Sequence, residues 1–250
     1  YKKKGYKSRS KDFNSSVKDS TTAEVFETLD VSASRTEMIV SKYQNYIIGI
    51  VGLSVIIVLG YLGYENFILQ PKTEEANNEL FTAQNYFNKA LNDSENKDSL
   101  FLLSLNGGEG KYGFLDIADE YSGTDAGNLA NYYAGVSYLQ MKQYDKAIDY
   151  LSKFDSEDQM LGPVSLGAIG DAFAQLDQQE EALKYYENAV SMSSSELTAP
   201  RFLLKAGIIA IDLGKSSVAL KHLNAILDDY PKSPEAEKAT LYLGKAEAMK

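Results

Sequence analysis

The residue types that carry most enzyme chemistry are scarce in this sequence of 250 residues. It contains one histidine, His222, and no cysteine. A zinc site or a nucleophile–base pair needs several such side chains within reach of one another. His222 lies beside Lys221, with no nucleophile or second ligand at a suitable spacing. The sequence therefore predicts an ordinary helix-surface histidine and no zinc, thiolate or disulfide chemistry.

A glycine-rich loop and pairs of adjacent acids are the other candidates for a chemical site. The loop NGGEGKYG (106–113) is similar to a phosphate-binding loop, but no Ser or Thr follows Lys111, and Leu105 occupies the place of the first required glycine. Adjacent acids on one helix do not face each other; Asp228/Asp229 and Glu180/Glu181 are examples of such pairs. We therefore expect a flexible turn, solvated acids, and no cofactor, metal or enzymatic activity.

The elements that carry these residues are helices that recur with a period of 35 to 37 residues. Each of three glycines is followed twelve residues later by an alanine, and a fourth glycine, Gly244, follows 37 residues after the third. The pairs are Gly135/Ala147, Gly170/Ala182 and Gly207/Ala219. Small residues let two antiparallel helices approach closely, and one such hairpin cannot bury its own apolar face. The pattern predicts stacked hairpins, with these large side chains between the units: Tyr138, Leu151, Phe154, Phe173, Tyr186, Leu223 and Ile226.

This pattern resembles the tetratricopeptide repeat, which has Gly and Tyr on its first helix, Ala and Phe on its second, and a closing proline such as Pro231. The resemblance covers about 128–250, without the repeat tryptophan and with a period above 34. A degenerate unit is predicted before it, with a long helix from about Thr73 to Leu91 packed against its second helix, which carries Phe114, Ile117 and Tyr121. In the last helix we expect Ser233 as N-cap and Pro234 at the first position.

A second kind of helix is predicted near residue 50. The 19 residues Tyr46–Tyr64 carry no charge and would span roughly 28 Å as a helix, close to the ~30 Å of a bilayer core. Aromatic residues flank both ends, as at membrane interfaces: Tyr43, Tyr46, Tyr61, Tyr64 and Phe67. We predict a transmembrane helix over 43–69, the alternative being a buried core helix of a soluble protein. We do not expect a cleaved signal peptide, because the apolar run is long, begins far from the first residue, and is followed by no small-residue cleavage pattern.

Charge is distributed unevenly around this helix. Residues 1–45 hold nine basic and six acidic residues, a net +3, whereas residues 72–250 hold 16 basic and 28 acidic residues, a net −12. Lys and Arg resist translocation, so the sequence predicts residues 1–42 as a cytoplasmic tail and 72–250 as a periplasmic tetratricopeptide repeat domain. The acidic domain excludes nucleic-acid binding, which needs a basic face. The predicted fold class is all-α: one transmembrane helix followed by a tetratricopeptide-like helical-hairpin solenoid.

The tail is predicted to be partly disordered, because residues 1–20 have few aliphatic side chains to bury. Two capping boxes follow, Thr21-x-x-Glu24 and Ser34-x-x-Glu37, and each is expected to open a helix. A solvated leash and a short docking segment for a cytoplasmic partner are both compatible with this pattern.

Ligands of tetratricopeptide arrays usually lie on the concave face made by the first helices. Here the resemblance places eight residues on that face: Tyr132, Val136, Leu139, Asp171, Gln175, Leu204, Ile208 and Asp212. The Lys and Asn that clamp a peptide carboxylate in some members are absent from the fifth and ninth positions. An apolar, mildly acidic groove fits an extended or helical segment with exposed hydrophobic side chains. Alternatively, neighbouring helices bury several of these residues.

A tail, one anchor and an outward repeat domain together resemble the YfgM-like ancillary subunits of the bacterial SecYEG translocon. The most similar stretch is FLDIADEYSGTDAGNLANYYAGVSYLQMKQYDKAIDYL (114–151). The resemblance implies a non-catalytic accessory scaffold in the bacterial inner membrane, with SecYEG, a PpiD-like periplasmic chaperone and secreted polypeptides as partners. The alternatives are a scaffold of another cell-envelope assembly or secretion complex, and a signalling anchor whose tail is the active end.

Overall fold

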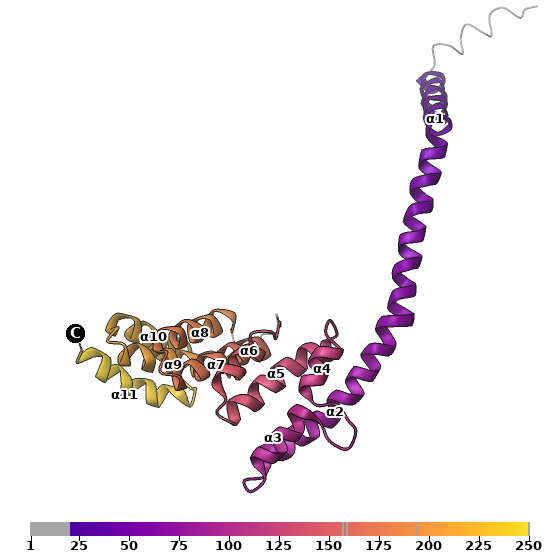
Figure 1. Cartoon of the computed structure of the whole chain (residues 1–250). Helices are drawn as coiled ribbons and strands as arrows, with labels where there is room; N and C mark the ends of the chain where they lie inside the picture. The colour runs from indigo at the N-terminus through magenta and orange to yellow at the C-terminus, as the bar shows by residue number, and fades with distance from the viewer. Residues whose placement is uncertain (1–20, 157, 159, 194, 250) are drawn as a thin grey trace, which may run out of the picture. The chain divides into compact units, whose positions relative to one another are not determined.

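A computed structural model describes residues 21–156, 158, 160–193 and 195–249, with side chains from residue 41 onward (Figure 1). The predicted disorder of residues 1–20 lies outside these ranges. The chain divides into two compact units, 1–67 and 68–250.

The N-terminal unit contains one long helix, α1 (Thr21–Tyr64). It runs through Ser34, so the prediction of a separate helix start there is wrong: one helix continues toward the span. Residues 41–62 are all exposed. The most apolar 18-residue stretch of this helix has a mean hydropathy of 2.3, and none of its residues is buried against the rest of the described chain. Ser54 donates its hydroxyl hydrogen to the carbonyl of Ile50 at 2.8 Å, which satisfies that polar group within the helix. This helix is long and apolar enough to cross a membrane, which is consistent with the predicted single-pass membrane protein.

A short π-helical turn, Glu65–Leu69, follows α1 and leads into α2 (Gln70–Asn92). Pro71 stands in the first turn of α2, where its missing N–H and its ring disfavour a regular α-helical bond to Phe67, four residues earlier. The wider turn accommodates the proline, and Thr73 compensates locally by donating to the Leu69 carbonyl at 2.8 Å.

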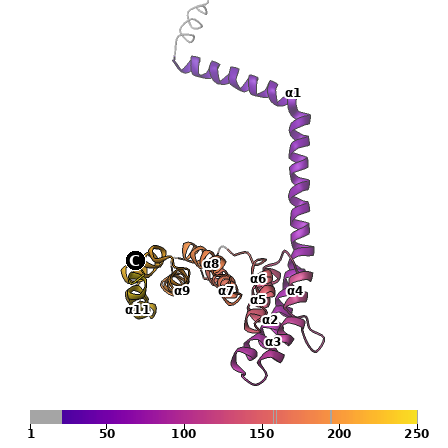
Figure 2. The same cartoon turned by 60° about the vertical axis from the view of Figure 1, so that its left-hand side comes forward.

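The second unit is built from helical hairpins, shown in two orientations in Figures 1 and 2. Consecutive helices pack against each other from α4 to α11, and α2 packs on both α3 and α5. This confirms the all-α class and the predicted repeat region. After α2 the helices are α3 (Lys97–Asn106), α4 (Phe114–Glu120), α5 (Asp125–Gln140), α6 (Tyr144–Leu151), α7 (Leu161–Gln175), α8 (Gln179–Met192), α9 (Ala199–Asp212), α10 (Ser216–Asp229) and α11 (Glu235–Glu247).

An aromatic cluster forms the first core of this unit, where α2, α3, α4 and α5 meet. The rings of Phe87 and Phe101 are 5.6 Å apart, edge to face, and those of Phe114 and Tyr133 are stacked at 5.1 Å. Burying each such ring contributes about 1.5–3 kcal/mol. The predicted long helix before the repeats is α2, whereas α3 was not predicted.

Each hairpin of the repeat region closes around a glycine. A Cβ added at Gly135 would lie 2.5 Å from Leu151 Cγ, and one at Gly170 would lie 2.7 Å from Tyr186 Cε1. Gly207 stands in the same relation to Leu223, at 2.8 Å from Cδ2. Leu151, Tyr186 and Leu223 therefore fill space inside their own hairpin, a contact that the expected place between units does not include. Leu151 also belongs to a small core with Ala168 and Ile169 of the next hairpin. The paired alanines Ala147, Ala182 and Ala219 are fully buried.

The turn inside each hairpin is the same structure repeated three times. The residue seven after the glycine has a positive φ: Lys142 (60°), Asp177 (59°) and Gly214 (72°). The next residue donates its backbone N–H back to the first helix, as Lys215 does to Ala210 O at 2.8 Å. This is the hydrogen bond of a Schellman C-cap, which favours glycine at the left-handed position. The first helix of each hairpin therefore ends with the same backbone geometry, although the residue with positive φ differs from one hairpin to the next.

The last helix begins differently from the prediction. Pro234 is the N-cap of α11, with no side-chain cap hydrogen bond. The Ser233 hydroxyl is buried without a partner in the described structure, while the Ser233 carbonyl accepts from Ala236 N at 3.1 Å. Ser233 therefore does not cap the helix, because a backbone turn takes that role. In contrast, Thr124 does cap α5, accepting from Gly127 N at 3.0 Å.

Two glycine substitutions test the hairpin packing. We expect Gly135→Ala to destabilise the domain, because the new methyl would also lie 2.9 Å from the Leu151 backbone nitrogen, an overpacking cost of about 1–3 kcal/mol. Gly244→Ala is the matched control: no atom lies within 4 Å of its Cβ position, so helix propensity should add up to about 1 kcal/mol of stability. Urea unfolding of the full chain, followed by circular dichroism, measures both. Equal effects of the two changes would contradict the close contact.

Candidate protein-binding surface

The eight residues predicted for a concave face lie on the first helices α5, α7 and α9. Their exposure differs: Gln175 and Asp212 are exposed, Leu204 is buried, and the others are half-buried. Leu204 belongs to the apolar core of the α8–α11 region, so it offers little surface to a ligand. The remaining half-buried residues are Tyr132, Val136, Leu139, Asp171 and Ile208.

The apolar members on α5 form one continuous surface with the next hairpin. Tyr132, Val136 and Leu139 all pack against a small core that includes Ile169 of α7. Tyr132 also contacts Phe154, with ring centroids 5.3 Å apart. The structure thus brings the α5 residues together as partly covered apolar side chains.

The polar members connect neighbouring hairpins instead of standing free. Asp171 accepts a hydrogen bond from the Tyr186 hydroxyl at 2.7 Å and forms an ion pair with Lys205 of α9. Lys205 also lies over the Tyr186 ring, 5.5 Å from its centroid. Asp171 is therefore a bridge between α7, α8 and α9, and only part of its carboxylate remains for a ligand.

The other two polar residues make weaker bridges of the same kind. Gln175 accepts from the Tyr144 hydroxyl at 3.2 Å, and Asp212 lies 3.9 Å from Lys245 Nζ. Both contacts join a first helix to an adjacent hairpin. Exposed pairs of this type contribute about 0–1 kcal/mol, so these two positions can change without unfolding the domain.

A second set of bridges links the second helices and was missed from the sequence. Glu180 Oε2 lies 2.5 Å from Lys215 Nζ, and Glu187 Oε1 lies 2.9 Å from His222 Nε2. His222 is buried, with 5% of its surface exposed, so the prediction of an ordinary helix-surface histidine is wrong. Each acid precedes its partner by 35 residues, close to the repeat period, and that spacing is the signal that would have revealed the pairs.

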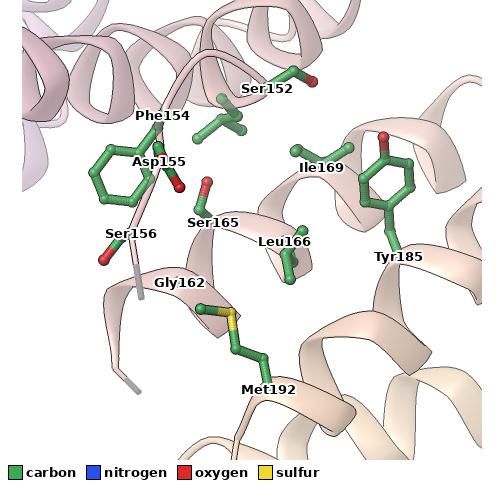
Figure 3. A pocket seen from close by; sticks show the side chains of 11 residues that line it. Ser152, Phe154, Asp155, Ser156, Gly162, Ser165, Leu166, Ile169, Tyr185 and Met192 are labelled. Carbon is green, nitrogen blue, oxygen red and sulfur yellow. The ribbon is translucent and has the colours of Figure 1, made fainter. Parts of the chain in front are cut away.

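Three hollows in the described surface lie away from the predicted face. One of about 350 Å³ is enclosed by the α6–α7 loop, α7 and α8 (Figure 3). Others lie around Tyr230–Pro234 and beside Asn85 and Asn88. None of the eight predicted residues lines any of these three.

Comparison with known families identifies the hairpins. One tetratricopeptide-repeat model matches residues 129–157 and 202–233, and a second matches residues 164–196. The chain contains tetratricopeptide repeats. The matched segments fall on α5–α6, α9–α10 and α7–α8, the three hairpins that close around a glycine. No curated protein matches the sequence significantly. Tetratricopeptide repeats mediate protein–protein interactions and are generally non-catalytic, so the repeat domain fits a scaffold that binds other proteins.

Tyr186, the buried tyrosine that donates to Asp171, should make the stability of the folded domain sensitive to alkaline pH. Burial, followed by the charge of Asp171 and the hydrogen bond to it, raises the pKa of Tyr186. The unfolded chain releases this proton above pH ~10 while the folded chain keeps it, so stability is complete below pH ~10 and falls above it, by up to about 1.4 kcal/mol per pH unit for one tyrosine.

We therefore expect Tyr186→Phe to make the fall in stability above pH ~10 shallower. Below that pH the variant should be about 1–2 kcal/mol less stable, since the hydrogen bond to Asp171 is lost. Urea denaturation over a pH series measures both effects. Identical slopes above pH ~10 for the two proteins would show that Tyr186 ionises as freely in the folded as in the unfolded chain.

Proposed function

We propose that this protein is a membrane-anchored, non-catalytic scaffold that serves as an accessory subunit of the Sec translocon. Residues 1–42 form its cytoplasmic tail, 43–69 its transmembrane helix, and 72–250 its periplasmic repeat domain. The observation that carries the proposal is one chain that joins an uncovered apolar helix to tetratricopeptide repeats. The excess of basic residues before the helix supports this orientation in a bacterial inner membrane.

Within this proposal, SecYEG and a PpiD-like periplasmic chaperone are the partners, and secreted polypeptides are the clients. The contact surface is the first-helix face that contains Tyr132, Val136, Leu139 and Ile208, which are half-buried and can accept apolar side chains. Gln175 and Asp212 form its exposed polar edge. Partly covered apolar groups suit transient contact with emerging chains, because an extended segment can add to them without unfolding the array.

Orientation can be measured directly because the chain has no cysteine. We expect Asn188→Cys, at an exposed position of α8, to react in intact inner membranes with a thiol reagent that does not cross lipid. Ser10→Cys in the tail should react only after the membrane is opened. The opposite pattern would place the repeat domain in the cytoplasm and remove the proposed partners.

The binding face can be tested with two matched double variants. Gln175→Arg with Asp212→Arg places cations on the proposed face, whereas Asn188→Arg with Asp228→Arg makes the same charge change at exposed positions of second helices. After crosslinking in cells and purification in mild detergent, we expect the wild type and the second variant to recover SecY or a periplasmic chaperone. The first variant should recover several-fold less.

The outcomes of this purification separate the alternatives. Recovery of the protein alone would contradict a scaffold function of this kind. Recovery of outer-membrane or cell-wall factors would favour another envelope complex. A signalling anchor would lose function on deletion of residues 1–30 while keeping its external partners, whereas a translocon scaffold should keep both. Equal recovery by the two double variants would show that the first-helix face is not the contact surface.

A further inference from the structure

The hollow at the α6–α7 junction lies apart from the predicted first-helix face. Its volume is about 350 Å³, at the low end of the range for ligand pockets. The walls are mostly apolar, and the α6–α7 loop and Met192 of α8 lie on opposite sides of the opening (Figure 3). The main wall residues are Leu151, Phe154, Leu166, Ile169, Tyr185 and Met192.

Two hydrogen bonds from α5 hold the pocket wall at Asp155. Asn128 of α5 donates its side-chain N–H to the Asp155 carbonyl at 2.6 Å, and its oxygen accepts from Asp155 N at 3.0 Å. This paired contact fixes the backbone of Asp155 and leaves its carboxylate unused. The shape of the pocket therefore persists when the Asp155 side chain changes.

Two oxygen-bearing side chains inside the pocket have no partner. Figure 3 shows the Asp155 carboxylate and the Ser165 hydroxyl directed into the hollow. Ser165 as a whole residue is 4% exposed, whereas Asp155 is exposed. In the described structure the Ser165 hydroxyl makes no hydrogen bond and Asp155 makes no ion pair. A hydroxyl and a carboxylate that face the same hollow favour a ligand that donates hydrogen bonds and carries a positive charge.

Gly162 packs closely against two parts of the pocket lining. A Cβ at Gly162 would lie 2.4 Å from Met192 Cε and 2.9 Å from the Ser156 carbonyl oxygen. Glycine therefore lets α7 approach both the loop and α8, while the Met192 thioether borders the cavity. The hollow therefore has apolar side chains beside hydrogen-bond acceptors, a combination that suits a flexible stem with a charged head.

We propose that this pocket binds an arginine side chain presented by an exposed segment of a partner protein. The aliphatic stem lies against Leu166 and Met192, and the guanidinium group stacks on the aromatic wall and donates to Asp155 and Ser165. A guanidinium fits better than an ammonium because its planar fork can donate to two acceptors and stack on a ring. The net charge of −12 over residues 72–250 attracts such a partner. This site differs from the proposed first-helix face and does not depend on which complex the protein joins.

The five methionines make the test direct. The full chain, labelled at its methionine methyl groups and held in lipid nanodiscs, is titrated with N-acetyl-arginine amide and followed by NMR. We expect the Met192 signal to shift and saturate while the other methionine signals stay in place. N-acetyl-citrulline amide, which has the same shape without the charge, should bind about tenfold or more weakly.

Variants complete the test. Asp155→Asn keeps the shape of the side chain and should lower the affinity for the arginine probe about tenfold, and Ser165→Ala should also weaken it. Asp228→Asn, an exposed acid on α10, makes the same charge change and should bind as the wild type does. An unmoved Met192 signal, equal binding of citrulline, or unchanged binding by Asp155→Asn would each overturn the proposal, and unchanged positions of the other methionine signals would confirm that the variant is folded.

Discussion

The repeat domain depends on one contact, made three times, between the backbone of a first helix and a large side chain of the second. Gly135, Gly170 and Gly207 each leave the space that a side chain sixteen residues later fills. A helix pair at this distance buries its alanines completely but cannot cover its outer apolar residues. Those residues become the contact with the next hairpin, so the spacing inside a hairpin also sets how hairpins stack.

Hydrogen bonds and ion pairs between hairpins also fix how neighbouring hairpins are aligned. Asp171, Glu180 and Glu187 reach partners on the following hairpin, and each pair forms only when two hairpins lie in one alignment. Exposed pairs contribute little free energy, so stability comes mainly from the buried apolar side chains. Part of the acidic character of the domain is therefore engaged in stacking, and the charge available to a partner is smaller than the composition indicates. Asp155 is one of the acids that form no ion pair in the described structure.

Features that depend on a local sequence pattern could be predicted from the sequence. Features that depend on how hairpins stack could not. The glycine–alanine spacing and the uncharged run near residue 50 are local signals, and both elements are present. Helix α3 was missed because LFLLSL lacks a clear helical period and precedes a glycine-rich loop. His222 was assigned to the surface because its own helix gives no hint of Glu187, which comes from another hairpin. Ser233 has a good capping sequence, yet a backbone turn takes the role. The eight face residues were placed from the repeat register, which says nothing about how far neighbours cover Leu204.

These features bear on how strongly such a domain can bind. A face whose carboxylates already bridge hairpins and whose apolar groups are half-covered offers modest affinity to any one segment, and a pocket for a single arginine also binds weakly by itself. Weak contacts suffice when partner and scaffold are confined to the same membrane, because tethering raises the effective concentration and makes two such contacts cooperate. Under the proposed function, the anchor thus supplies part of the affinity, while the repeats retain the fast release that handling of many different chains requires.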